Sequence, residues 1–97
     1  MAQAAMKNLF REIWREKFGD NIGYCEVCGH PIREPTVHNF SHIYSRGARP
    51  DLRYDKRNIQ VWCSTFDRDK GCHTLWHNQP HLFWERAREH GWEKPEL

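Results

Sequence analysis

Apolar side chains along residues 2–18 recur at the three- and four-residue spacing that is typical of an amphipathic helix. The residues in this pattern are Met6, Leu9, Phe10, Ile13, Trp14 and Phe18. Gly19 follows where a C-terminal glycine cap is expected, and Asp20 and Asn21 favour a turn. We therefore predict an N-terminal helix within residues 1–19 that packs on the domain and carries no chemistry, with a dimer face as the alternative.

Residues 36–44 alternate between two sets of side chains, which is the pattern of a β-strand. One set comprises Val37, Asn39, Ser41 and Ile43, and the other comprises His38, Phe40, His42 and Tyr44. Residues 58–62 predict a second, shorter strand, and Gly47 and Pro50 mark the segment between them as a loop. We expect the two strands to pair in antiparallel orientation.

Two further helices are predicted near the C-terminus. The first spans residues 72–78, and the second spans residues 79–91, where Pro80 suits the first turn and Gly91 suits the end. The second helix has a modest apolar face, and one more aromatic residue is expected to pack back on it: Leu82, Phe83, Ala87 and then Trp92. Residues 93–97 are expected to fray.

Size and composition fit one domain of the α+β class. A chain of 97 residues makes a modest core that benefits from an additional staple. No run approaches the roughly 18 apolar residues of a membrane span, and the first residues lack a signal-peptide pattern. We therefore expect a single soluble domain over residues 1–97, in an intracellular compartment and without a membrane partner.

Four cysteines supply the staple that so small a domain needs. Cys25 and Cys28 form a CxxC knuckle in which both thiolates can point at one ion, and Gly29 allows its tight turn. Cys63 and Cys72 would complete a tetrahedral four-thiolate site, and zinc suits it because zinc is redox-inert and binds sulfur well. In a reducing compartment, cysteines are metal ligands more often than disulfides.

The second pair of cysteines does not form another CxxC knuckle, because eight residues, 64–71, separate Cys63 from Cys72. Either this segment loops out, or His30 or His73 replaces one thiolate. We favour the loop because residues 66–71 have the composition of a turn. Buried free thiols are the alternative to a metal site.

Taken together, these elements resemble the HNH endonuclease family, the ββα-metal nucleases in their zinc-stapled form. The resemblance rests on the CxxC knuckle, on Ser41-His42-Ile43 after a strand-like run, on Asn58 five residues before Cys63, and on Cys72-His73 opening a helix. It covers residues 25–77 and implies a small ββα-metal core, stapled by zinc and flanked by a helix at each end. The commonest form of the family uses CxxC twice, unlike this chain.

The resemblance also implies a catalytic set. His42 would be the general base, because an imidazole titrates near the operating pH, and Asn58 would brace the base and the strand pair. His73 and His77 share one face of a helix and would bind the catalytic ion, Mg²⁺ or Mn²⁺, although Ni²⁺ and Zn²⁺ also suit imidazole. Cys72 and His73 diverge by about 100° on a helix, so one can face the zinc and the other the cleft. The alternatives are a histidine that caps the strand and two exposed histidines.

Ser41 stands where many family members place Asp or His as a ligand to the catalytic ion, and a neutral hydroxyl binds a divalent ion poorly. Three alternatives remain open. Ser41 binds through a water, His38 or Asn39 takes its place, or a DNA phosphate completes a weakly held shell. In an extended strand His38 would lie about 13 Å from His42, unless a β-bulge shortens that distance.

Five basic residues fall within twelve positions that include only two acids, Asp51 and Asp55. They are Arg46, Arg49, Arg53, Lys56 and Arg57. This cluster predicts a surface that contacts DNA phosphates beside the site, with a solvated loop as the alternative. Arg53 lies in a segment that resembles phage recombination-type HNH proteins, and it either contacts phosphate or pairs with Asp51 or Asp55.

The expected function is therefore metal-dependent hydrolysis of DNA, by nicking or by cutting both strands, for which a homodimer would be convenient. So small an HNH protein resembles bacteriophage or mobile-element products, which act in the cytoplasm of a bacterial host. Two other functions also fit: a zinc-knuckle module that binds DNA without cutting it, and a structural zinc domain that binds protein through its N-terminal helix. Phosphate contacts make affinity fall steeply with salt, so salt dependence separates DNA binding from the last function.

Overall fold

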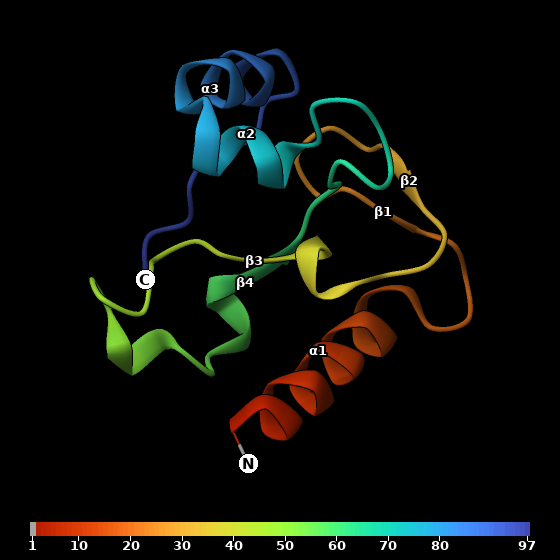
Figure 1. Ribbon diagram of the computed structural model, residues 1–97, viewed down its shortest axis with the longest axis vertical. Coiled ribbons are helices and arrows are strands. Elements are labelled where there is room, and N and C mark those ends of the chain that lie inside the picture. Colours follow the sequence, from red (N-terminus) through yellow and green to blue (C-terminus); the bar gives the residue numbers. More distant parts are fainter. Residues whose placement is uncertain (1) are drawn as a thin grey trace.

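The computed structural model describes residues 2–97, with side chains from residue 5 onward, and has an α+β architecture (Figure 1). Three α-helices and two small antiparallel strand pairs follow one another along the chain, with three single 3₁₀ turns between them. In chain order they are α1 (Ala2–Phe18), β1 (Gly23–Tyr24), β2 (Pro31–Ile32), η1 (Val37–Asn39), β3 (Phe40–His42), η2 (Pro50–Leu52), η3 (Lys56–Asn58), β4 (Ile59–Val61), α2 (Cys72–Asn78) and α3 (Pro80–Glu89).

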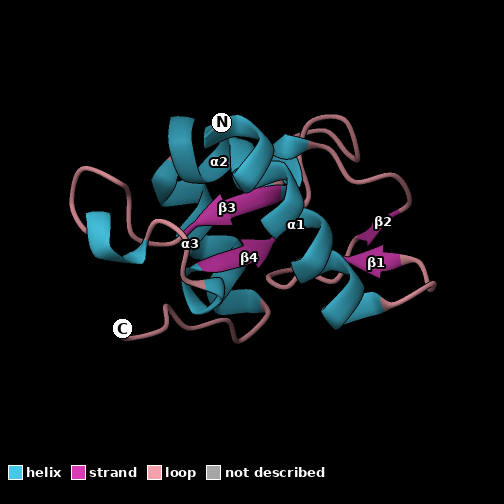
Figure 2. Ribbon diagram, turned by 90° about the horizontal axis from the view of Figure 1, so that it is seen from below, coloured by secondary structure: helices cyan, strands magenta, loops and turns pink. Residues whose placement is uncertain are grey.

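The pair β3–β4 lies in the middle of the molecule, with α2 and α3 at one end and α1 at the other (Figure 1). The strands are antiparallel, with Ser41 opposite Gln60 and His42 opposite Ile59, as the alternating pattern predicted. Figure 2 shows that β1 and β2 form a separate pair beside this hairpin. The three helices predicted from the sequence are all present, within two residues at each boundary described.

The first predicted strand is shorter than expected, because residues 37–39 form the 3₁₀ turn η1 in its place. Thr36 caps this turn: its hydroxyl accepts a hydrogen bond from the backbone of His38, and the Asn39 side chain bonds back to the backbone of Thr36. Such reciprocal capping satisfies backbone groups that an extended chain would leave to a partner strand. The prediction that residues 37–39 are extended was therefore wrong, whereas Thr36 is extended as expected.

Aromatic side chains fill the core on the α2–α3 side of the hairpin. Trp62 and Phe83 are fully buried, and their rings stack with centroids 4.9 Å apart. Trp76 and Trp92 pack edge-on against Trp62, so the expected return of Trp92 onto the domain is confirmed. The indole N–H groups of Trp62 and Trp92 both donate to the Gln60 side chain, which leaves neither polar group unsatisfied.

On the opposite side, α1 packs its apolar stripe against β3. Phe10 and Ile13 are buried, and the Phe10 ring stacks on Phe40 at 4.4 Å. Trp14 lies against Gly23 so closely that a Cβ atom at Gly23 would come within 2.2 Å of the indole. The sequence-predicted helix is thus a structural part of the domain, and its position leaves its polar face exposed to solvent.

The last residues do not fray as expected. The Tyr44 hydroxyl donates to the carbonyl of Pro95, and Arg49 donates to that of Leu97, so the C-terminal segment lies against the loop that follows β3. Lys94 is thereby placed over the Tyr44 ring. Among residues 2–97, no helix combines the length and apolar character needed to cross a membrane.

Candidate functional site

The four cysteines form one compact cluster. Their sulfur atoms all lie within 4.8 Å of one another, and those of Cys28 and Cys63 are 3.6 Å apart. A disulfide would bring two sulfurs to about 2 Å, and all four cysteines are free. Four sulfurs placed tetrahedrally around zinc at 2.3 Å are about 3.8 Å apart. The cluster therefore fits a metal ion, as the sequence predicted, and its chemistry is compatible with structural zinc.

Local structure on both sides of the cluster explains how the cysteines meet. Cys25 and Cys28 lie in the turn between β1 and β2, where Gly29 has the positive φ of 79° that glycine adopts without strain. Cys63 lies two residues after the end of β4, and Cys72 begins α2. The knuckle is joined to the central hairpin by the side chain of Glu26, which accepts a hydrogen bond from the Val61 backbone.

The segment 64–71 loops out between Cys63 and Cys72, which confirms the favoured alternative. Asp67 holds its base by accepting hydrogen bonds from the Ser64 backbone and from the Asn39 side chain. At the other end, a Cβ atom on Gly71 would lie 2.3 Å from the Ser64 backbone, so only glycine allows the two ends to meet this closely. His30 does not replace a cysteine, since its Nε2 bonds to the backbone of Asp67.

Two arginines that the sequence analysis did not single out point at the cluster. Nη1 of Arg68 lies 3.6 Å from Sγ of Cys28, and Nη1 of Arg86 lies 3.5 Å from Sγ of Cys72. The backbone N–H of Cys72 also donates to Cys63 Sγ. Four thiolates around a divalent ion carry a net charge of −2, and these donors offset it.

The cluster needs a cation to hold four thiolates. The pKa of Cys28 is lowered, chiefly because Cys25 donates a hydrogen bond to its thiolate, whereas the pKa of Cys63 and of Cys72 is raised, chiefly by the sulfur of Cys25. These opposite pKa shifts mean that Cys28 favours the thiolate form, whereas Cys63 and Cys72 favour the thiol form. A metal ion bound here would displace the thiol protons and would stabilise the fold at the same time.

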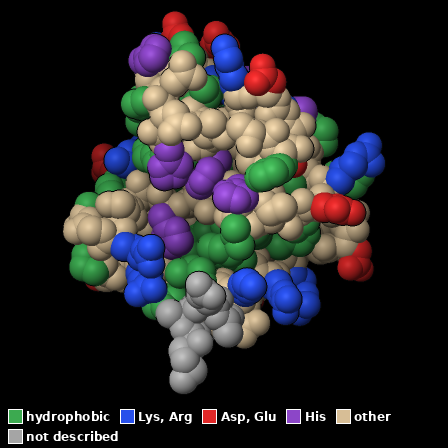
Figure 3. Space-filling view, viewed as in Figure 1, with side chains coloured by type: hydrophobic (Ala, Val, Ile, Leu, Met, Phe, Trp, Pro, Cys, Tyr) green, Lys and Arg blue, Asp and Glu red, His purple; other side chains and the backbone are tan. Residues whose placement is uncertain are grey.

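A second centre lies on the other side of α2. A cleft of about 440 Å³ is lined by residues of β3, the loop after it, α2 and the C-terminal segment: Phe40, His42, Ile43, Tyr44, Ser45, Arg46, Ala48, His73, Trp76, His77 and Lys94. Figure 3 shows histidine side chains gathered in the middle of this face. The structure thus brings together the three histidines that the resemblance assigned to catalysis.

His42 is fixed by a backbone group. Its Nε2 lies 3.0 Å from the carbonyl oxygen of Arg53. A carbonyl oxygen only accepts hydrogen bonds, so in this bond Nε2 carries the proton and Nδ1 keeps its lone pair. An imidazole held in this tautomer can take a proton through Nδ1.

Asn58 is fully buried and braces the loop between the strands. Its Oδ1 accepts from the backbone of Tyr44 at 2.7 Å, and its Nδ2 donates to the carbonyls of Tyr44 and Leu52 at 3.0 and 3.2 Å. Leu52 is next to Arg53, whose carbonyl holds His42. The amide therefore fixes both ends of the segment that positions the histidine.

His73 and His77 pair on one face of α2, with ring centroids 4.6 Å apart. The Ser41 hydroxyl lies 2.7 Å from Nδ1 of His73, and Ser41 is buried. This arrangement leaves Nε2 of His73 for the cleft. Ser41 thus contacts a candidate ligand directly, as a group that orients the ring, a role the sequence analysis did not consider.

Burial keeps His73 neutral. The pKa of His73 is lowered from 6.5 to about 4, first by loss of solvation and then by the nearby His77 and His38. A metal binds the neutral form of imidazole, so the low pKa keeps this nitrogen available in mildly acidic solution.

His38 lies beside His73. The turn η1 places its ring 6.4 Å from that of His73 and 5.4 Å from that of Phe66, an aromatic residue 73% exposed on the looped-out segment. Within residues 2–97, however, the cysteine cluster is the one group of three or more potential ligands within 4.8 Å of one another. His73 and His77 are therefore a two-histidine pair, with His38 beside them.

The structure places the five basic residues of the loop in different surroundings. Lys56 bridges Glu12 and Glu16 of α1. Two more pair with acids two positions away, Arg49 with Asp51 and Arg57 with Asp55. Arg53 stacks on Tyr54 with its Nε buried and unbonded, and it forms no ion pair with Asp51 or Asp55 in residues 2–97.

Arg46 alone of the five lines the histidine cleft, and Lys94 joins it there. Lys94 was missed because it belongs to a segment expected to fray. Its ammonium group lies 4.5 Å from the centre of the Tyr44 ring and 5.9 Å from that of Trp76. Two cations thus face the cleft from separate parts of the chain.

No family model, curated protein or solved structure matches this chain. The resemblance to HNH endonucleases therefore stays a prediction from the sequence, and the function has to be argued from the geometry of the two centres.

Proposed function

We propose that this protein is a metal-dependent DNA endonuclease of the HNH type, which hydrolyses phosphodiester bonds in the histidine cleft. One observation carries the proposal. His42, whose Nε2 is held by the Arg53 carbonyl, lines the same cleft as the His73–His77 pair. A base and a pair of metal-binding nitrogens around one cleft are the two components that phosphodiester hydrolysis requires.

In the proposed reaction His42 removes a proton from water through Nδ1, and the resulting nucleophile attacks phosphorus in line with the departing 3′ oxygen. The Arg53 carbonyl stabilises the imidazolium that forms, because Nε2–H continues to donate to it. Asn58 keeps this carbonyl in position through its bond to the adjacent residue, Leu52. By resemblance to the family, the products carry 5′-phosphate and 3′-hydroxyl ends.

His73 and His77 would hold the catalytic ion, Mg²⁺ or Mn²⁺, which when bound offsets negative charge on the phosphate and on the leaving oxygen. When Nδ1–H of His73 donates to the Ser41 hydroxyl, Nε2 of that ring is left as the ligand atom. His38, or a phosphate of the substrate, completes the shell.

The surroundings of the cleft suit DNA as the substrate. Arg46 and Lys94 line it and supply positive charge for the phosphates on either side of the cleaved bond. In chain order β3, β4 and α2 provide His42, the strand opposite it and the His73–His77 pair. This order is that of a ββα-metal core, and a zinc ion in the cysteine cluster would join its second strand to its helix.

A plasmid assay tests the proposal. Purified protein is incubated with supercoiled plasmid and Mg²⁺ or Mn²⁺, and nicked and linear forms are resolved on a gel. We expect nicking that His42→Ala lowers by about 10²- to 10⁴-fold, the range for loss of a general base. His81→Ala is the matched control, because His81 is an exposed histidine of α3 outside the cleft. DNA affinity and thermal stability should be equal in both variants.

A second candidate function is a zinc-knuckle module that binds DNA without cutting it. It is favoured by the absence, within residues 2–97, of a third potential ligand close enough to the His73–His77 pair to complete a preformed site. A wild-type protein that retains zinc and binds DNA, but leaves the plasmid intact with Mg²⁺, Mn²⁺, Ni²⁺ and Zn²⁺, would establish this function in place of the first.

A further inference from the structure

The exposed face of α1 carries three basic residues that no part of the histidine cleft uses. Lys7, Arg11 and Arg15 are spaced four residues apart, so they form one row along the helix, called here the α1 stripe. All three are exposed, and none makes an ion pair within the described part of the chain. The row is therefore a line of cations open to solvent.

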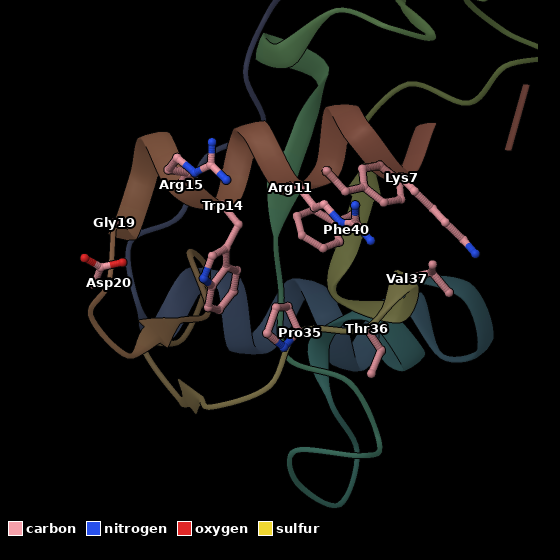
Figure 4. Close-up of a pocket in the computed structure, with 11 residues that line it drawn as sticks. Lys7, Arg11, Trp14, Arg15, Gly19, Asp20, Pro35, Thr36, Val37 and Phe40 are labelled. Atoms are coloured by element: carbon pink, nitrogen blue, oxygen red, sulfur yellow. The ribbon is translucent and has the colours of Figure 1, made fainter. Parts of the chain in front are cut away.

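The α1 stripe borders a groove of about 720 Å³. Figure 4 shows Lys7 and Arg11 extending from α1 toward the opposite wall, which is formed by residues 35–37, with the rings of Trp14 and Phe40 between the two walls. Asp20 is the one acid among the residues that line the groove, and it lies beyond Gly19 at the end of the helix. The groove thus combines positive charge with an apolar floor.

The acids of α1 are directed elsewhere. Glu12 and Glu16 both accept hydrogen bonds from Lys56, and Lys17 pairs with Glu26. The two acids of the helix therefore lie on the side that faces the loop between the strands, where Lys56 offsets part of their charge. The side that faces the groove keeps a net positive charge.

This groove adjoins the histidine cleft at Phe40, which lines both. Figure 3 shows basic side chains along the edge of the face below the histidines, where Figure 1 places α1. Successive members of the stripe are separated by a rise of about 6 Å along the helix, a distance comparable to that between neighbouring phosphates of one strand. A polyanion bound across the cleft would meet this row as it leaves.

We propose that the α1 stripe is a second DNA-binding surface, which contacts the phosphates of the strand that leaves the histidine cleft past Phe40. The inference rests on the proposed function only in taking DNA as the ligand. The stripe contacts the phosphates of the DNA backbone and reads no base. Its side chains lie on an open surface and do not enter a DNA groove, where the bases present their hydrogen-bond donors and acceptors. In this proposal α1 supports the core through its apolar face and holds the DNA substrate in register through its exposed face.

Salt-dependent binding tests the proposal. Fluorescence anisotropy measures affinity for a mixed-sequence DNA duplex at several NaCl concentrations, without Mg²⁺ or Mn²⁺ so that no cutting occurs. The stripe variant carries Lys7→Gln, Arg11→Gln and Arg15→Gln. The control variant removes the same charge from exposed positions outside both cavities, through Arg33→Gln, Lys70→Gln and Arg88→Gln.

Each phosphate contact contributes about −0.9 to the slope of log affinity against log salt concentration. We expect the slope of the stripe variant to be less steep than that of wild type by about 2 to 3. We also expect its affinity at 0.1 M salt to be about 10- to 100-fold lower. The control variant should stay within about threefold of wild type, since charges more than a Debye length from the DNA are screened.

The outcomes separate this inference from the proposed nuclease function. Equal loss of affinity in both variants, or in neither, overturns the stripe while plasmid nicking by the wild type upholds the nuclease. Loss confined to the stripe variant in a protein that never nicks supports the stripe and removes the nuclease. A wild type that shows no salt-dependent affinity for DNA overturns both.

Discussion

The cysteine cluster and the histidine cleft differ in how much of each is built before anything binds. In the cluster, four ligand atoms already lie within 4.8 Å of one another, and two arginines and a backbone N–H point at the sulfurs. In the cleft, two histidines pair, a third lies beside them, and no third ligand closes the site in residues 2–97. A closed shell is typical of a structural metal, and an open one of a catalytic metal.

This difference follows from the position of each centre in the fold. Three of the four cysteines are buried, and they belong to the knuckle, to the end of β4 and to the start of α2. An ion there would tie together segments that are far apart in the sequence. The histidines project from the exposed side of α2 into a cleft, where a substrate can supply what the protein lacks. One helix therefore serves both centres, with Cys72 on one side and His73 on the other.

The largest effect is expected when one ligand is removed from the cysteine cluster. Cys63→Ser removes one thiolate from a fully buried position. Structural zinc in zinc-finger peptides contributes about 10–16 kcal/mol of coupled folding and binding, as much as or more than the 5–15 kcal/mol that stabilises a typical domain. We expect the variant to lose zinc and its cooperative thermal transition, as measured by elemental analysis and circular dichroism.

Thr65→Ser is the control for the zinc prediction, because it alters an exposed hydroxyl of the neighbouring loop and leaves the sulfurs intact. It should bind about one zinc per chain and melt like wild type. A Cys63→Ser protein that folds as well as this control, without bound metal, would show that the four sulfurs are buried free thiols.

A smaller effect is expected when only the supporting groups change. Arg68→Gln removes a donor to Cys28 Sγ, and Ser41→Ala removes the hydroxyl beside His73. Loss of such a partner typically lowers metal affinity by about 10- to 100-fold. We therefore expect Arg68→Gln to weaken zinc in a chelator competition, and Ser41→Ala to raise the Mn²⁺ concentration needed for half-maximal nicking.

The two substitutions are controls for each other. If the centres are independent, Arg68→Gln leaves the Mn²⁺ requirement unchanged and Ser41→Ala leaves zinc affinity unchanged. Both variants remove a polar contact next to α2, so a shared loss of stability would change both readouts in both proteins. That result would mean that the cleft and the cluster are one structural unit and not two metal centres.

Much of the cysteine cluster could be predicted from the sequence, because its signal is local. The CxxC spacing and the turn composition of residues 66–71 each predict their own geometry, and the boundaries of the helix from Cys72 to Asn78 follow from the same reasoning. The loop between Cys63 and Cys72 closes as expected. What could not be predicted is the support given by Arg68 and Arg86, since it depends on contacts between residues 14 to 40 positions apart.

The cleft was harder to predict for two physical reasons. The alternation of residues 36–44 indicated one strand, but the capping of Thr36 by Asn39 outweighed it and brought His38 toward His73. The positive charge available to the cleft also depends on which basic side chains form ion pairs with acids far away in the sequence. Lys56 forms ion pairs with Glu12 and Glu16, which lie 44 and 40 positions away in the sequence. Lys94, from the C-terminal segment, lines the cleft.

The smallest expected effect concerns the pH dependence of stability. It separates the contribution of His73 in the cleft from that of the cysteine cluster. The pKa of this ring is about 4 in the folded chain and 6.5 in an ordinary setting, because burial and two neighbouring histidines disfavour the charge. As pH falls below 6.5, the unfolded chain gains a proton that the folded chain refuses. Stability is therefore complete above pH 6.5 and declines toward pH 4, by about 1–2 kcal/mol between pH 7 and pH 5.

Acid also protonates the thiolates of the cluster, so the measurement has to isolate the histidine. Urea unfolding of wild type and of His73→Gln at pH 7 and pH 5 does so, because both proteins keep the same four cysteines. The wild type should lose about 1–2 kcal/mol more than the variant over this interval. Equal losses would assign the whole acid sensitivity to the cysteine cluster and would mean that His73 titrates in the cleft as it does in water. The low pKa would then no longer support its assignment as a metal ligand that stays neutral in mild acid.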